Sequence, residues 1–335
     1  MEWKESVRYL TQIGGFDDWG VFLWMTSMFR IIPAQIFLNF SYCILGTVSA
    51  VMLYNIGANI MPRRYAYIAA LSFSISSYTI LYHSQCLKET IMAFLIVASF
   101  NSFYSFLRRK KIQSILFALL YSILLLFFRV PVSLFLILSF GLTLILMYSR
   151  KILFPVLGAL ILVIIYFSPF FLRYTYDRYM SGGDIEAIIE RKVAISGGGI
   201  INQAVDPLAA IIGPFPSIAM NSVSSKPLSA SGLIYRVLLS FPFLLGTIYA
   251  FRYKCQKIYP LIFFFFANAI GLAISVKGLE LRLSYPHLSI MYLVAFWWLA
   301  NYDYHRIKQK IPNILIYGCF VVVLIICLVW NLRLS

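Results

Sequence analysis

Apolar runs long enough to cross a membrane recur along almost the whole chain. A helix of about 20 apolar residues crosses the hydrocarbon layer of a bilayer, which is about 30 Å thick. Lipid offers no hydrogen bonds to the backbone, so segments of this length favour helices. With 61% hydrophobic and 12% charged residues, the chain of 335 residues has more apolar side chains than a water-soluble domain usually carries. We therefore predict an all-α polytopic membrane protein with about ten transmembrane helices.

The predicted spans are separated mainly by short loops. One connection is far longer than the ~2–8 residues usual between bundle helices. Its glycine and proline clusters, among them Gly213-Pro214-Phe215-Pro216, predict a partly ordered lid with hinges or, alternatively, a flexible loop. The spans are 36–57, 65–82, 90–107, 112–128, 132–148, 152–171, 233–251, 258–276, 286–300 and 311–330. The predicted parts are outer interfacial helices in 1–30, six spans in 31–171, the long outer loop 172–232 and four spans in 233–335.

Basic residues in alternate loops orient these helices. Half of the 28 lysines and arginines lie in five short loops whose only acid is Asp303. By the positive-inside rule these loops are cytoplasmic, and the 172–232 loop lies on the periplasmic or extracellular side. The formal charge of +16 is thus explained by topology, and nucleic acid is not an expected partner. The loop positions are Arg63, Arg64, Arg108, Arg109, Lys110, Lys111, Arg150, Lys151, Arg252, Lys254, Lys257, Arg306, Lys308 and Lys310.

The first thirty residues contain two short helical patterns, Trp3 to Ile13 and Asp18 to Phe29. Neither is long enough to span a bilayer, so we expect them to lie along the outer membrane surface. One alternative is that a preceding span is absent from the sequence. Another is a short first span at 21–35, which would place Arg30 in lipid.

Cysteine and histidine spacing indicates no metal centre. The five cysteines form no CxxC pair, and no cluster of His, Asp or Glu has metal-ligand spacing, so we predict neither a metal nor a cofactor. A disulfide between Cys86 and Cys327 near the outer face remains an alternative. The sequence also lacks a P-loop and a nucleophile elbow, which disfavours cytosolic nucleotide chemistry.

Four cations come from separate parts of the chain to the predicted outer boundary. Ionisable groups are expensive in a bilayer, and guanidinium groups match the geometry of phosphate oxygens. We therefore predict one cavity, open to the outer leaflet, that binds the phosphate of a membrane-embedded lipid. The alternative for Lys88 and Arg129 is snorkelling to the interface, whereas Arg236, about one turn inside its span, favours function. The predicted phosphate-binding residues are Lys88, Arg129, Arg236 and Arg282.

Candidate catalytic bases lie on the same side. They are Asp17, Asp18, Glu89, Glu280 and His287. As alternatives, Glu89 would only stabilise a helix dipole, and His83 and His287 would only anchor the chain at the interface. Asn101 and Asn268 lie deeper in their spans and predict hydrogen bonds between helices.

Several of these residues together resemble a known family. In chain order they are Asp17-Asp18, Asn39, Tyr54, Arg63-Arg64, Ser84, Lys88-Glu89, Arg129-Val130-Pro131, Gly213-Pro214-Phe215-Pro216 and Arg282 to His287. The pattern resembles bacterial membrane proteins of surface-polysaccharide gene clusters, including Wzy-type O-antigen or capsule polymerases and related GT-C glycosyltransferases.

The resemblance implies a glycosyltransferase of lipopolysaccharide or capsule biosynthesis in the bacterial inner (cytoplasmic) membrane. Its substrates would be polyprenyl-diphosphate-linked oligosaccharide repeat units, joined at the outer leaflet. Membrane lipid and a chain-length-regulating membrane protein would be further partners. One alternative is a GT-C enzyme that uses a polyprenyl-phosphate sugar, with Asp17 or Asp18 as base. Another is a non-enzymatic flippase or transporter of lipid-linked glycans, which should carry its charges near the membrane midplane.

Overall fold

The computed structural model describes residues 18–147, 226–274 and 281–309, together with Gly318, Val321, Val322 and Ile325. All regular structure in these residues is helical, and none of it is strand. The predicted all-α class is confirmed for this part of the chain. The predicted span 152–171, the loop residues 172–225 and nearly all of 311–330 lie outside the described residues, so the division into four parts stays a prediction.

The described helices follow the predicted spans closely, with three differences. The predicted span 65–82 forms two helices, the helix expected to begin near 233 begins at Lys226, and the helix predicted at 286–300 extends over Leu281–Gln309. The helices are α2 (Trp19–Ile31), α3 (Gln35–Ile60), α4 (Arg63–Ser74), α5 (Ser77–Ser84), α6 (Lys88–Arg109), α7 (Ile112–Leu124), α8 (Val130–Met147), α12 (Lys226–Arg252), α13 (Tyr259–Ile274) and α14 (Leu281–Gln309). Two 3₁₀ turns complete them, η2 (Leu125–Phe127) and η3 (Gln256–Ile258).

The break between α4 and α5 falls in a serine-rich stretch. Ser76 has a ψ of 131°, which ends the helical conformation. Ser74 donates a hydrogen bond from its hydroxyl to the carbonyl of Ala70 at 2.8 Å. Serine hydroxyls compete in this way with the backbone hydrogen bonds of a helix. As a result α5 is a separate short helix, and it carries His83 and two tyrosines toward the bundle core.

Three described helices, α3, α6 and α8, are long and apolar enough to cross a membrane. With a rise of 1.5 Å per residue they measure about 39, 33 and 27 Å. α3 also exposes an apolar stripe that recurs every three to four residues. Lipid contact requires such a stripe, so these features are those of a membrane-associated helical protein. The stripe consists of Ile36, Phe40, Ile44, Val48 and Val51.

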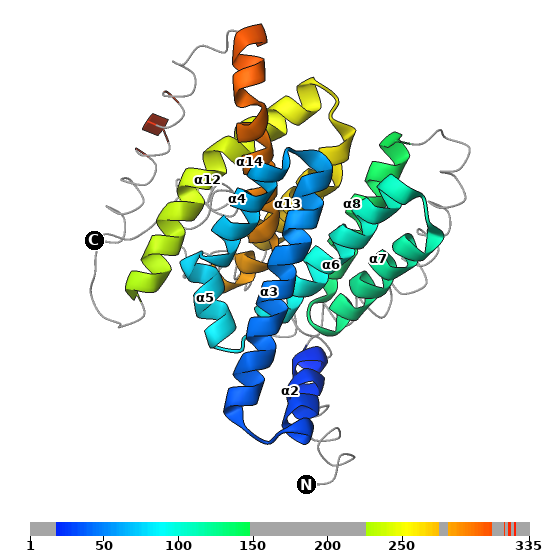
Figure 1. Cartoon of the computed structure of the whole chain (residues 1–335), viewed down its shortest axis with the longest axis vertical. Helices are drawn as coiled ribbons and strands as arrows, with labels where there is room; N and C mark the ends of the chain where they lie inside the picture. Colours follow the sequence, from blue (N-terminus) through cyan, green and yellow to red (C-terminus); the bar gives the residue numbers. More distant parts are fainter. Residues whose placement is uncertain are drawn as a thin grey trace, which may run out of the picture.

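The central helix of the bundle is α14. It packs against α3, α4, α6, α12 and α13, and lies among them in Figure 1. Every residue from Ser284 to Ala295 is buried. A helix that is buried on all sides has no outward polar face. Any polar side chain in that stretch of α14 must therefore find its partners inside the protein.

The basic turns described by the structure lie at one end of the bundle. Figure 1 shows the ends of α3, α6, α8 and α12 together there, while α2 lies at the other end. Two contacts join these turns: Arg108 Nη1 donates to Asn59 Oδ1 at 3.5 Å, and Gln256 Nε2 donates to the Leu146 carbonyl at 3.1 Å. This grouping agrees with the charge alternation in the sequence. The side of the membrane that this end faces stays a prediction.

α2 is a short helix beside the start of the bundle. Its 13 residues measure about 20 Å, less than the hydrocarbon thickness. The chain leaves the helix at Ile32, so 21–35 is not one continuous helix. α2 packs against α3 and η2, where Gly20 lies against the ring of Phe128. The predicted helix after Asp18 is thus confirmed, and its position on the membrane surface stays a prediction.

Candidate functional site

The guanidinium of Arg236 lies inside the bundle. It is 1% exposed, on α12, which packs against α5 and α14. Nη1 donates a hydrogen bond to Ser284 Oγ of α14, whereas Nε and Nη2 have no hydrogen-bond partner. In the described part of the chain no carboxylate pairs with Arg236. A buried charge with unfilled donors is costly in a low dielectric, so an acceptor that reached Nε and Nη2 would stabilise this arrangement.

Arg236 also lies deeper in its helix than the sequence indicated. Because α12 begins at Lys226, Arg236 is about 15 Å from the start of the helix and about 24 Å from its end at Arg252. The expected position was about one turn inside the span. The hydrogen bond to Ser284 and the electrostatic interaction with the tyrosines of α5 therefore lie within the bundle and not at its rim.

His287 lies on the same face of α14 as Ser284, because the two residues are three apart. It is fully buried, and its Nδ1 lies 2.6 Å from Asn268 Nδ2 of α13. An amide NH₂ only donates, so with the Asn268 amide in this orientation Nδ1 accepts and Nε2 carries the hydrogen. Nε2 has no hydrogen-bond partner. This tautomer favours donation to a ligand over the predicted role of His287 as a base, and full burial disfavours an interfacial anchor.

The unpartnered nitrogens of this cluster are all donors. They are Nε and Nη2 of Arg236 and Nε2 of His287, and Arg236 acts electrostatically on His287. A ligand that satisfies them must accept hydrogen bonds and carry negative charge. Phosphate oxygens do both, and a guanidinium can bind them through two parallel bonds. Among the described residues no three His, Cys, Asp or Glu side chains gather as metal ligands.

Aromatic side chains of α5 and α14 line one side of Arg236. Tyr78 and Tyr82 of α5 lie close enough to interact with its charge. Tyr82 packs on Tyr285 with 4.7 Å between ring centroids, and the Tyr285 hydroxyl lies 3.0 Å from His83 Nε2. Tyrosine combines an apolar ring with a polar hydroxyl, which suits a ligand that has both kinds of surface.

His83 fits against α3 only because residue 46 is glycine. A Cβ at Gly46 would collide with the imidazole ring. His83 is 9% exposed, so it is a buried part of the tyrosine wall and not the interfacial anchor that the sequence suggested.

Lys88 and Asp18 form an ion pair at the end of the bundle near α2. Their side chains are 16% and 25% exposed. The sequence assigned them separate roles, phosphate binding and catalysis, and the structure brings them to each other. The pair ties the start of α2 to the start of α6. No described contact connects Lys88 to Arg236.

Glu89 is buried in the first turn of α6. It is 1% exposed and lies within electrostatic range of Tyr42 on α3. Tyr42 and Gly46 are one turn apart on α3, so Glu89 and His83 border the same helix face. Among the acids whose side chains the structure describes, Glu89 is the buried one. It therefore remains a candidate base.

The remaining predicted residues are not joined to this cluster by a described contact. Arg129 is half-buried just before α8, where its backbone N–H donates to the Leu125 carbonyl at 2.9 Å. Arg282 lies in the first turn of α14, but its side chain is outside the described residues, as are Asp17 and Glu280. The single cavity lined by four cations thus stays a prediction.

Some residues of the cluster were not singled out from the sequence. Ser284 and Tyr285 lie in the Arg282 to His287 stretch, but neither had been assigned a role. The signal for Ser284 was its spacing of three residues from His287 on one helix face. Tyr285 had no such local signal, because its partner His83 lies 202 positions away. The interhelical hydrogen bond predicted for Asn268 is confirmed, with His287 as its partner.

No protein-family model, no curated protein and no solved structure matches this chain.

Proposed function

We propose that this chain is a membrane glycosyltransferase that joins polyprenyl-diphosphate-linked oligosaccharide units, as Wzy-type polymerases do. The observation that carries the proposal is the set of unpartnered donors on Arg236 and His287, inside a bundle that contains membrane-length helices. A lipid-linked diphosphate is an anionic acceptor of hydrogen bonds that is already anchored in the membrane. The family resemblance implies the same substrate class.

The topology that goes with this function has about ten spans in a bacterial inner membrane. The basic turns face the cytoplasm, and the end of the bundle that holds Lys88 and Asp18 faces the outer leaflet. In this orientation the polyprenyl chain stays in lipid beside the bundle. The diphosphate reaches Arg236 from the outer half of the membrane, and the glycan extends outward.

Transfer requires one bond to break and one to form. The bond between the anomeric carbon and the diphosphate oxygen breaks, and the diphosphate leaves with the electron pair. The acceptor hydroxyl oxygen bonds to the anomeric carbon, and its proton passes to a carboxylate, for which Glu89 is our candidate. Arg236 and His287 stabilise the charge that develops on the leaving diphosphate. Such electrostatic stabilisation is usually the largest single contribution to lowering the activation barrier.

A lipid-linked glycan transporter is the second candidate, and the depth of Arg236 favours it. A transporter is expected to bind its substrate near the membrane midplane. Arg236 lies near the middle of α12, not at its end. The same phosphate-binding donors would then hold the lipid-linked glycan during translocation, and no bond would change.

The test replaces the gene in its native strain with an Arg236→Lys variant. Lysine keeps the charge but loses the planar fork of donors, so polymerised surface glycan should form about a hundredfold more slowly. Arg252→Lys is the matched control, because Arg252 is an exposed arginine on the same helix and should leave the glycan ladder unchanged. A full ladder from Arg236→Ala at normal protein level would refute the proposed site.

Purified protein in liposomes separates the candidate functions. Supplied with a lipid-linked oligosaccharide, a polymerase forms products of two and then more repeat units on one lipid. A GT-C enzyme supplied with a polyprenyl-phosphate sugar adds one sugar. A transporter moves the lipid-linked glycan between leaflets without changing its mass.

A further inference from the structure

A groove of about 550 Å³ lies at the basic end of the bundle, far from the candidate site. Ile60 and Met147 border it, and these are the last residues of α3 and α8, two of the membrane-length helices. The groove therefore lies at the ends of two helices that are long enough to cross a membrane. In a bilayer this is the level of the lipid headgroups. About 20 Å of α12 separates Arg236 from Tyr249, which lines the groove.

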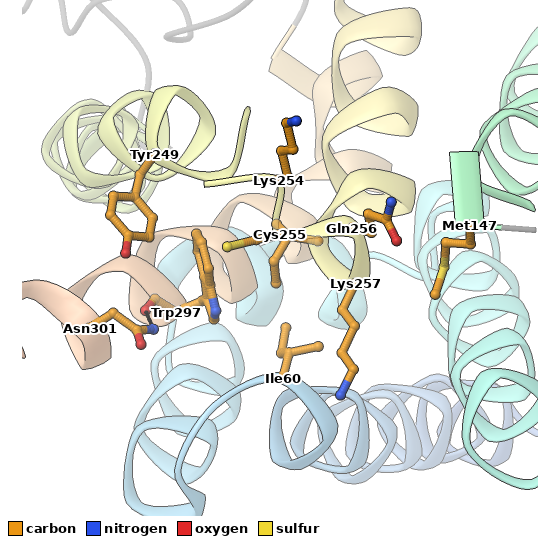
Figure 2. Close-up of a pocket in the computed structure, with 10 residues that line it drawn as sticks. Ile60, Met147, Tyr249, Lys254, Cys255, Gln256, Lys257, Trp297 and Asn301 are labelled. Carbon is orange, nitrogen blue, oxygen red and sulfur yellow. Dashed lines mark hydrogen bonds between the residues drawn. The ribbon is translucent and has the colours of Figure 1, made fainter. Parts of the chain in front are cut away.

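One side of the groove is the turn between α12 and α13. Lys254, Cys255, Gln256 and Lys257 line it, and the two lysines are exposed. Figure 2 shows the Lys257 side chain extending from this turn toward Ile60. The ammonium group of Lys257 thus lies beside Ile60, at the end of α3 (Figure 2).

The backbone of this turn is held in place from several directions. Tyr104 donates its hydroxyl to the Lys257 carbonyl at 2.5 Å, and Gln256 Nε2 donates to the Leu146 carbonyl at 3.1 Å. The partners in these two bonds belong to α6 and α8, and they fix the position of the turn. Neither bond involves the ammonium group of Lys257. The groove is preorganised for a ligand in this respect.

Lys254 occupies a backbone conformation that normally takes glycine. Its φ is 53°, and the N–H of Cys255 bonds to the Ala250 carbonyl at 2.8 Å while that of Lys254 bonds to the Phe251 carbonyl at 3.2 Å. This bonding pattern closes a helix end with a left-handed residue, usually glycine. A lysine there carries a steric penalty at its Cβ that glycine avoids. The left-handed conformation at Lys254 thus places a second positive charge beside the groove.

Two aromatic side chains and one amide side chain, those of Tyr249, Trp297 and Asn301, form the opposite wall of the groove. Tyr249 and Trp297 pack with 5.7 Å between ring centroids, and the Asn301 side chain donates to the Trp297 carbonyl at 2.7 Å. Tryptophan and tyrosine are enriched at the level of lipid headgroups. Arg108 adds charge at the same end of the bundle, where it reaches Asn59 beside Ile60.

We propose that this groove binds the phosphodiester headgroup of an anionic phospholipid, with Lys257 as its main cation. Basic pockets between helices at the cytoplasmic surface suit such headgroups. This inference goes beyond the proposed function, because it concerns a different end of the bundle and a ligand that is not a substrate.

Native mass spectrometry of the full chain, purified in detergent and titrated with phosphatidylglycerol, tests the proposal. Lys257→Gln should weaken phosphatidylglycerol binding about fivefold, since one lysine near an anionic lipid surface contributes about that factor. Lys257→Arg should bind as the wild type does. Lys110→Gln is the matched control, because Lys110 is another exposed lysine at the basic end of the bundle but does not line the groove, and it should leave binding unchanged.

Two outcomes would overturn the proposal. Equal phosphatidylglycerol binding by the wild type and Lys257→Gln would remove the site. Binding of inorganic phosphate that depends on Lys257, without binding of phosphatidylglycerol, would assign the groove to a free anion and not to a lipid. Neither outcome depends on Arg236, so a failure here is distinct from a failure of the proposed function.

Discussion

Lys88 and Arg236 are two cations for which the sequence suggested one role, yet the structure places them in opposite situations. Lys88 is partly exposed and paired with Asp18, whereas Arg236 is buried with two of its three nitrogens unpartnered. A paired cation near the surface contributes modest stability and is already neutralised. A buried cation without an anion is costly until a ligand arrives. The difference indicates that charge alone does not single out a candidate binding residue, and that unfilled hydrogen-bonding capacity is the more selective criterion.

The largest effect is expected when the charge of Arg236 is removed altogether. Arg236→Met should raise the free energy of unfolding by roughly 1–4 kcal/mol, because an unbranched apolar side chain of comparable length avoids burying the charge. Activity should be lost at the same time. Thermal unfolding in detergent, followed by tryptophan fluorescence, measures the first effect. A large drop in stability would show that Arg236 is satisfied within the folded protein and needs no ligand.

Two glycines test the packing of the two regions, Gly46 against the His83 ring and Gly20 at the end of the bundle near the Lys88–Asp18 pair. Gly46→Ala forces a methyl group into the buried ring of His83, and should destabilise the protein by roughly 1–3 kcal/mol. Gly20→Ala meets the Phe128 ring near the Lys88–Asp18 end, where α2 is a short peripheral helix that can shift. We expect a smaller loss there. Melting temperatures of the two variants give the ranking, and a larger loss from Gly20→Ala would contradict it.

The smallest effect is expected at the ion pair itself. Lys88→Ala and Asp18→Ala should each lower stability by about 1 kcal/mol or less, because partly exposed pairs are screened by solvent. The charge-swapped double variant, Lys88→Asp with Asp18→Lys, should regain most of that loss. Glycan synthesis should persist in the swapped protein if the pair is structural. Loss of synthesis with stability retained would return Lys88 to the phosphate site.

The positions of the helices could be predicted from the sequence with little error. The span predicted at 36–57 is α3 at Gln35–Ile60, and the span at 132–148 is α8 at Val130–Met147. Hydropathy over about 20 residues is a local property, and a helix satisfies its backbone within the same segment. The grouping of the basic turns at one end of the bundle could also be predicted, because helices joined by short loops place alternate loops at the same end. The break at Ser76 was missed, because an apolar pattern continues through it.

The partners of the polar side chains were decided only by tertiary structure. Lys88 meets Asp18 across 70 positions of the chain, and Tyr285 meets His83 across 202. The role of His287 depends on which of its nitrogens Asn268 occupies, and that depends on how α13 packs against α14. Which segments are helical and apolar follows from the residues of each segment alone, since those properties are local. Which cation pairs with an acid and which is buried with unfilled donors depends on contacts between distant helices, and only their packing settles it.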